Sequence, residues 1–222
     1  MFTSIAPRYD LLNHLLSFGL DRWWRGRALR ALEWTRAPAG RYLDLCAGTL
    51  DVAARLARQR GFRGFVVAAD FAAPMLAAGA GKAPATVVAP VAADAQQLPL
   101  PDGSMDGVIV AFGIRNVASL DAALREAHRV LAPGAPLVIL EFTTPRRRLV
   151  RAAYHLYFHQ LVPIVGGAIS GYPAAYRYLP ESVAQFPAEA ELAARMRGAG
   201  FADVRWTSLT FGVAAIHSGR RT

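Results

Sequence analysis

The sequence contains one cysteine and no apolar segment as long as a membrane span. With Cys46 as the only thiol among 222 residues, the chain cannot form an internal disulfide or a metal site built from several cysteines. The best apolar run, residues 161–169, is shorter than the roughly 18 residues that a membrane-spanning helix needs, and Pro163 interrupts it. Arg8 and Asp10 interrupt the N-terminal segment, which argues against a secretory signal peptide. We therefore expect a cytoplasmic protein.

Lysine is almost absent, because Lys82 is the only one among 25 lysines and arginines. The net charge is +9, and it is unevenly distributed along the chain. Residues 1–41 carry +4 and residues 145–178 carry +5, whereas residues 42–144 carry −1. Two interpretations stay open. The arginines are either a solvated surface shaped by GC-rich coding, or they meet a polyanionic partner such as nucleic acid or an anionic membrane.

The middle of the chain alternates apolar runs with helical spacing, which predicts parallel strand–helix–strand units. The apolar runs are nearly continuous, as is typical of a sheet covered on both faces. Two further runs follow near the C-terminus, and the last alternates like an antiparallel strand. We therefore expect an α/β fold with a mostly parallel seven-stranded sheet and helices on both faces. The expected strands are 41–46, 65–70, 86–91, 106–112, 136–142, 201–206 and 210–217, and the expected helices of the core are 51–60, 72–81 and 120–131.

We expect a single domain over residues 1–222, with a core at 38–144 and C-terminal strands at 188–222. Two segments, 1–37 and 145–187, fall outside the alternation and are the two basic ones. Insertions of this kind usually cover a site at the carboxyl ends of the strands. We interpret them as helical lids. The aromatic side chains that we expect to wall an apolar groove are Trp23, Trp24, Trp34 and those of residues 154–165.

Acidic residues follow the first three predicted strands. The first strand runs through Asp44 into a turn with Gly48, the second ends at Asp70, and Asp94 follows the third. A strand–glycine turn–helix presents backbone N–H groups to a polar ligand, and an acid after the second strand suits a ribose with two free hydroxyls. The dinucleotide pattern G-x-G-x-x-G is missing. These features predict a nucleoside site without a pyrophosphate.

The order of the motifs DLCAGT, VVAAD, DAQQLP and PDGSMD resembles the class I S-adenosylmethionine-dependent methyltransferases. More distinctive motifs resemble one family among them, the menaquinone/ubiquinone C-methyltransferases. These motifs are the opening signature at 2–25, FGIRNV at 112–117 and YRYLPESVAQFP at 176–187. The resemblance covers almost the whole chain. It implies a Rossmann-like fold and S-adenosylmethionine as the cofactor.

Carried over to this sequence, the cofactor contacts of that family fall on Thr49, Asp70, Asp94 and Ala95. Together with the acids and the glycine turn, the expected cofactor-binding residues are Asp44, Gly48, Thr49, Asp70, Phe71, Asp94, Ala95 and Ala111, and no metal is expected.

The chain departs from the family pattern at two positions. Leu50 replaces a usual glycine, and a leucine at positive φ would be strained by roughly 1–2 kcal/mol. Ala111 replaces a frequent serine, which would remove a hydroxyl contact worth about 1 kcal/mol.

The implied reaction transfers a methyl group from a sulfonium to a ring carbon of a polyprenylated quinol. Such a reaction needs a general base, or a cation that stabilises the phenolate. Arg115 either stabilises that oxyanion or holds its own loop by hydrogen bonds. The two lid tyrosines, Tyr9 and Tyr176, either act in catalysis or pack the lid. The candidate catalytic residues are Tyr9, Asp10, Arg115, Asn116 and Tyr176, and further candidates are His14, His155, His159 and Tyr178.

We expect the substrate to be demethylmenaquinol, with the ubiquinone pathway as an alternative. The basic and aromatic lids predict peripheral contact with an anionic membrane, at the inner face of the cell membrane. A nucleic-acid methyltransferase is disfavoured, because an N-P-P-[YF] motif is missing after the fourth strand. A methyltransferase for another lipid or small metabolite, a non-catalytic scaffold of a quinone-synthesis complex, and a homodimer stay open.

Overall fold

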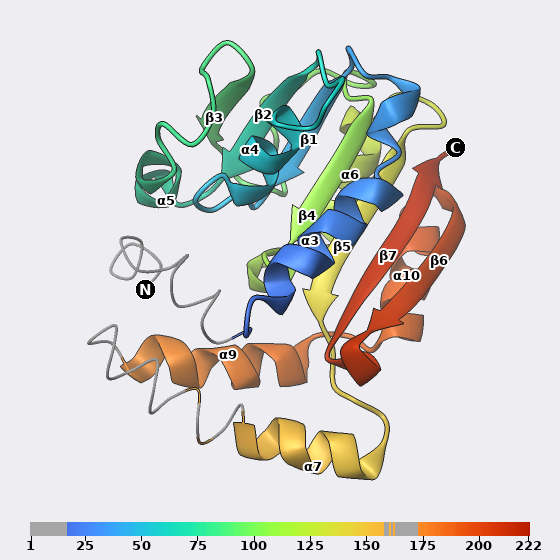
Figure 1. Cartoon of the computed structure of the whole chain (residues 1–222). Coiled ribbons are helices and arrows are strands. Elements are labelled where there is room, and N and C mark those ends of the chain that lie inside the picture. Colours follow the sequence, from blue (N-terminus) through green and yellow to red (C-terminus); the bar gives the residue numbers. More distant parts are fainter. Residues whose placement is uncertain (1–16, 158–159, 161, 163–172) are drawn as a thin grey trace.

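The computed structural model describes residues 17–157, 160, 162 and 173–222, and for residues 173–177 it describes the backbone alone. Seven strands form one sheet in the order β3-β2-β1-β4-β5-β7-β6 (Figure 1). The first five strands pair in parallel, and β7 runs antiparallel between β5 and β6. This confirms the predicted mostly parallel sheet. The strands are β1 (Arg41–Leu45), β2 (Phe65–Asp70), β3 (Val88–Ala92), β4 (Gly107–Ala111), β5 (Pro136–Phe142), β6 (Phe201–Leu209) and β7 (Ala214–Arg221).

Helices cover both faces of the sheet. Figure 1 shows α3 and α4 in front of the sheet and α6 and α10 behind it. The helices α7 and α9 lie below the carboxyl ends of β4 and β5. The described helices are α3 (Leu20–Ala31), α4 (Asp51–Ala57), α5 (Ala73–Ala78), α6 (Leu120–Val130), α7 (Arg148–Leu156), α9 (Pro173–Gln185) and α10 (Glu189–Gly198), with 3-10 turns η2 (Trp34–Arg36), η3 (Ile114–Asn116) and η5 (Thr210–Gly212).

Two hydrophobic clusters fill the space between the helices and the sheet. Successive residues of a strand point to opposite faces. Val108 and Val110 of β4 therefore belong to the cluster under α6 and α10, whereas Ile109 belongs to the cluster under α3, α4 and α5. Both faces of the central strands are thus buried, which explains their continuous apolar sequence.

The C-terminal part differs from the sequence prediction in two places. Residues 188–222 hold helix α10 before the two strands, and Leu192 and Met196 of this helix are buried. The last strand begins at Ala214 and not at residue 210, because Phe211 takes a left-handed conformation (φ 57°) in the η5 turn.

The lid segment 145–187 also contains a helix that we did not predict. Helix α9 continues through Pro180, a residue that lowers helix propensity strongly. Within the described ranges, no helix has the length and apolarity that a membrane crossing requires.

Candidate functional site

The loop between β1 and α4 reverses direction within a few residues. Cys46 (φ 57°), Gly48 (φ 52°) and Leu50 (φ 66°) all take the left-handed conformation. The Ala47 N–H donates to the Ala69 carbonyl of β2 (3.0 Å), so the loop is fastened to the neighbouring strand. The tight turn keeps the loop backbone close to the carboxyl ends of β1 and β2.

Leu50 has a positive φ (66°), the backbone conformation in which we expect a leucine to be strained. A left-handed leucine costs roughly 1–2 kcal/mol. Its side chain is buried in the cluster under α3, α4 and α5, and burial of a leucine contributes about 1.5–3 kcal/mol. Burial therefore offsets the strain, and the loop keeps its turn without a glycine at this position.

Asp70 ends β2 and is held by backbone hydrogen bonds. Its Oδ2 accepts from the Gly48 N–H (2.8 Å), and its Oδ1 accepts from the Ala72 N–H (2.8 Å). Each carboxylate oxygen can accept more than one hydrogen bond, so Asp70 keeps acceptor capacity for ligand hydroxyls. Phe71 follows with its ring largely exposed.

Asp94 lies beyond the end of β3, in a turn that its own side chain stabilises. Its Oδ1 accepts from the Gln96 N–H (2.8 Å), and these hydrogen bonds from Gln96 lower the pKa of Asp94. The next residue, Ala95, is buried. The carboxylates of Asp70 and Asp94 therefore stand on adjacent strand ends, as the sequence pattern predicts for a nucleoside.

Asp44 is a buried acid near the carboxyl end of β1. Its Oδ2 accepts from the Ala53 N–H in the first turn of α4 (2.9 Å). Burial raises the pKa of Asp44 to about 7, although the Ala53 hydrogen bond and the charge of Arg25 oppose this shift. A cationic ligand nearby would favour the ionised form of Asp44.

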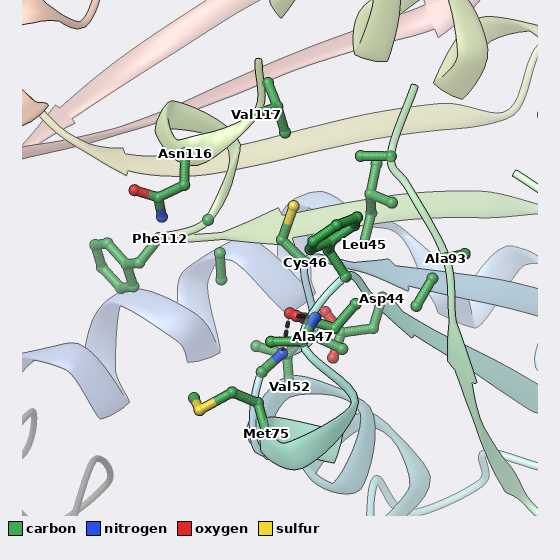
Figure 2. A pocket seen from close by; sticks show the side chains of 18 of the residues that line it. Asp44, Leu45, Cys46, Ala47, Val52, Met75, Ala93, Phe112, Asn116 and Val117 are labelled. Carbon is green, nitrogen blue, oxygen red and sulfur yellow. Dashed lines mark hydrogen bonds between the residues drawn. The ribbon is translucent and has the colours of Figure 1, made fainter. Parts of the chain in front are cut away.

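One cavity of about 350 Å³ joins these features. This volume lies within the usual range for small-molecule sites. Figure 2 shows Phe112 and Asn116 on one side of the β1–α4 loop and Ala93 on the other. All eight expected cofactor-binding residues line it. The lining residues are Arg25, Asp44–Thr49, Asp51, Val52, Ala69–Ala72, Met75, Ala93–Gln96, Ala111–Gly113 and Asn116–Ala118.

Arg115 lies behind this cavity and is absent from its described lining. Its Nη1 donates to Glu141 Oε1 (2.6 Å) and to the Phe112 carbonyl (2.8 Å), and its Nε donates to Ser182 Oγ of α9 (3.3 Å). Both members of the ion pair are buried. Burial raises the pKa of Glu141, and Arg115 opposes that shift. The geometry therefore favours the interpretation in which Arg115 holds its loop.

Asn116 is the expected catalytic residue that the structure brings to the cavity. Tyr178 of α9 donates its hydroxyl to Asn116 Oδ1 (3.1 Å), which leaves the amide nitrogen to donate to a ligand. Tyr9, Asp10, His14 and His159 lie outside the described residues, and the side chain of Tyr176 is not among them either. His155 is exposed on α7.

We expect the three tryptophans to wall one apolar groove, but in the structure they do not lie on a common wall. Trp24 is buried against Phe112 and Phe142, and its Nε1 donates to Thr210 Oγ1 (2.9 Å). Trp34 packs edge-on against Phe62. Trp23 alone of the three is exposed, because consecutive residues of α3 point about 100° apart around the helix axis and only Trp24 faces the core.

The residues around the cavity fit S-adenosylmethionine. Asp70 offers acceptors for ribose hydroxyls, and the buried Asp44 and Arg25 offer one group of each sign for a ligand that carries both charges. The seven-stranded sheet, with antiparallel β7 between β5 and β6, is the fold of the class I S-adenosylmethionine-dependent methyltransferases. The solved methyltransferases from Aquifex aeolicus (TM-score 0.59, 20% identity, 83% of each chain) and Thermotoga maritima (TM-score 0.63, 18% identity, 99% and 100% of the chains) share this fold.

Sequence similarity identifies the family. Residues 1–221 match the profile of the ubiE/COQ5 methyltransferase family, and the chain belongs to this family. It is 54% identical to the demethylmenaquinone methyltransferase of Thermus thermophilus, over the full length of both proteins. It is 44% identical to the ubiquinone/menaquinone biosynthesis C-methyltransferase UbiE of Geobacter sulfurreducens, over the whole of this chain and 87% of that protein.

Proposed function

We propose that this methyltransferase converts demethylmenaquinol to menaquinol. The observation that carries the proposal is the cavity at the carboxyl ends of the strands, where Asp70 at the end of β2 and Asn116 beyond β4 lie on opposite sides of β1. When bound, S-adenosylmethionine would supply a methyl cation equivalent: the ring carbon would gain the methyl group, the sulfonium would become a neutral thioether, and the proton that the ring carbon loses would be released to solvent.

The residues of the chain orient and desolvate this reaction. Asp70 and Asp94 hold the nucleoside, and the apolar wall of Ala111 and Phe112 excludes water. The Asn116 amide donates to the quinol oxygen and stabilises the negative charge that develops when the ring hydroxyl loses its proton. Tyr178 keeps the amide in that orientation through its 3.1 Å hydrogen bond.

An assay of the purified protein with methyl-labelled S-adenosylmethionine and two reduced quinols tests this function. We expect the parent protein to transfer label to the naphthoquinol that lacks the ring methyl group. We expect Asp70→Asn to transfer no label to this naphthoquinol. Transfer to a ubiquinone-type benzoquinol alone would contradict the menaquinone assignment. Absence of transfer to either quinol by a folded protein that binds S-adenosylhomocysteine would contradict quinol methylation.

The helix α7 and the η5 turn support a second proposal, peripheral contact with an anionic membrane. Leu149 (88%), Leu156 (61%) and Phe211 (76%) expose most of their side chains. Arg148 and Arg151 lie exposed at the N-terminal end of α7, where the helix dipole disfavours positive charge. Their position therefore does not stabilise the helix, whereas each contributes about 1 kcal/mol near an anionic bilayer.

Sedimentation with vesicles of anionic and of neutral lipid tests this contact. We expect binding to the anionic vesicles at low salt, release at high salt, and weaker binding for the double variant Arg148→Gln/Arg151→Gln. The matched control is Arg195→Gln/Arg197→Gln on α10, which we expect to bind like the parent protein. Equal binding by all three proteins would overturn the proposed surface.

A further inference from the structure

Arg25 is a buried cation on helix α3 whose hydrogen bonds use one side of its guanidinium. Nη1 donates to Asp21 Oδ2 (2.7 Å) and to Asp51 Oδ2 (3.2 Å). Within the part of the chain that the structure describes, Nε is buried without an acceptor, and Nη2 makes no hydrogen bond. The residue is 8% exposed. A buried donor without an acceptor is costly, so it points to a missing partner.

The two free donors, Nε and Nη2, form one side of the planar guanidinium. This side presents two parallel N–H groups at the spacing of a carboxylate, which is the arrangement of bidentate arginine–carboxylate pairs. The acids already present, Asp21 and Asp51, both bind at the opposite nitrogen. The unsatisfied side of Arg25 therefore suits a carboxylate that comes from a ligand.

Arg25 also lines the ligand cavity, and it does so at the end away from the nucleoside acids. Its guanidinium carbon lies 5.8 Å from the centre of the Phe112 ring, just beyond the end of β4. In the sheet, β4 lies on one side of β1, whereas β2 and β3 lie on the other. Figure 2 shows Phe112 and Ala93 on opposite sides of the β1–α4 loop. A ligand whose nucleoside contacts Asp70 and Asp94 thus extends its other end toward Arg25.

Asp51 does not depend on Arg25 as its sole counter-charge. Lys82, the only lysine of the chain, places Nζ 2.6 Å from Asp51 Oδ1. Arg25 is therefore able to share its charge with a ligand while Asp51 keeps a cationic partner. This arrangement brings α3, the first turn of α4 and the segment after α5 together at one end of the cavity.

We propose that Arg25 binds the carboxylate of the amino-acid part of S-adenosylmethionine through Nε and Nη2. The proposal rests on the function proposed above, and it assigns to helix α3 the recognition of the amino-acid end of the cofactor, which takes no part in the chemistry. Docking of α3 and cofactor binding are then coupled, because the residue that fixes α3 to Asp51 also contacts the ligand.

Isothermal titration with S-adenosylmethionine and with its decarboxylated analogue tests this assignment independently of catalysis. The parent protein should prefer the carboxylated ligand by about tenfold or more, since hydrogen bonds between charged groups are worth that much. Arg25→Gln should bind S-adenosylmethionine about 10- to 100-fold more weakly and the decarboxylated analogue within about twofold of the parent. Arg25→Lys keeps the charge without the planar pair of donors and should give an intermediate preference.

The matched control is Arg30→Gln, the same substitution at an exposed position of the same helix, which should keep the preference of the parent. An equal loss of affinity for both ligands in Arg25→Gln would assign Arg25 a structural role and overturn the proposal. Unchanged affinity for S-adenosylmethionine would overturn it too. If the parent protein binds neither S-adenosylhomocysteine nor 5′-methylthioadenosine, the proposed function fails, and the two failures are thereby distinguished.

Discussion

Leu50 shows how a single residue balances backbone strain against burial. The residue is the N-cap of α4, it has a φ of 66°, and its side chain is buried. The sequence alone indicates that Leu50 is strained. It does not show that burial of the side chain offsets this strain, because burial depends on how α4 and α5 pack on the sheet.

We expect Leu50→Gly to be more stable than Leu50→Ala by about 1 kcal/mol, because glycine relieves the left-handed strain and alanine does not. Both variants should be less stable than the parent by about 2–5 kcal/mol, the usual cost of removing a buried leucine side chain. Urea unfolding measures the three values. The control is Leu56 in the interior of α4, where glycine should be worse than alanine. The same order at both positions would contradict the strain at residue 50.

Asp44 makes stability depend on pH. Its pKa is about 7 in the folded protein and near 3.8 when exposed, so the folded state holds an extra proton between these values and stability falls as the pH rises through this window. Asp44→Asn should therefore raise the unfolding free energy on the order of 2–4 kcal/mol at pH 8 and change it little at pH 4.

Thermal unfolding of Asp44→Asn across this pH range gives the comparison, with Asp203→Asn at an exposed position as the control. A gain that is the same at pH 4 and pH 8 would show that the proton on Asp44 is not its source.

At the scale of the element, α9 is fixed to the core by side-chain hydrogen bonds to η3 and its flank. Tyr178 donates to Asn116, and Ser182 accepts from Arg115. The sequence does not predict this helix, because Pro180 and the glycine- and tyrosine-rich composition of its surroundings disfavour helix formation. Tertiary contacts of this kind override local propensity.

The sequence of helix α10 carries charge features that favour a helix, although we did not predict one there. Glu189 and Glu191 stand in its first turn and Arg195 and Arg197 in its last, as the helix dipole favours. In contrast, the predicted strands begin within two residues of the observed ones at β1 to β6, because their apolar runs are buried on both faces or end at clear turns.

The buried ion pair behind the cavity should be essential for the docking of α9. Glu141→Gln leaves the Arg115 charge buried without its counter-ion, and we expect a loss of about 3–5 kcal/mol in unfolding free energy together with faster amide exchange in α9. Guanidinium unfolding and hydrogen exchange measure the two effects. Glu181→Gln, at an exposed position of α9, is the control. A loss below about 1 kcal/mol would mean that Arg115 needs no buried counter-charge.

At the scale of the whole molecule, the cavity lies at the carboxyl ends of the parallel strands and is lined by residues of both hydrophobic clusters. The order of strands and helices along the sequence was sufficient to predict a site at these strand ends, and Asp70 and Asp94 line the cavity there. Arg25 was not predictable in this way, because its place in the cavity follows from the packing of α3 against β4, β5 and α4, which are distant in sequence.

Ligand binding should stabilise the molecule as a unit. At a concentration 100 times the dissociation constant, S-adenosylhomocysteine adds about 2.7 kcal/mol. For a chain of this size that is a rise of about 5–10 °C in Tm. Scanning calorimetry measures the rise, and Asp70→Asn should abolish most of it. An equal rise in this variant would place the nucleoside elsewhere.

The single thiol of the chain makes the cavity chemically addressable. Cys46 lies on the cavity wall, and burial raises the pKa of its thiol, so alkylation at neutral pH is slow. A fluorophore or spin label attached there occupies one known position. The rate of its attachment reports whether the cavity is filled, and no residue has to be engineered into the protein to read that signal.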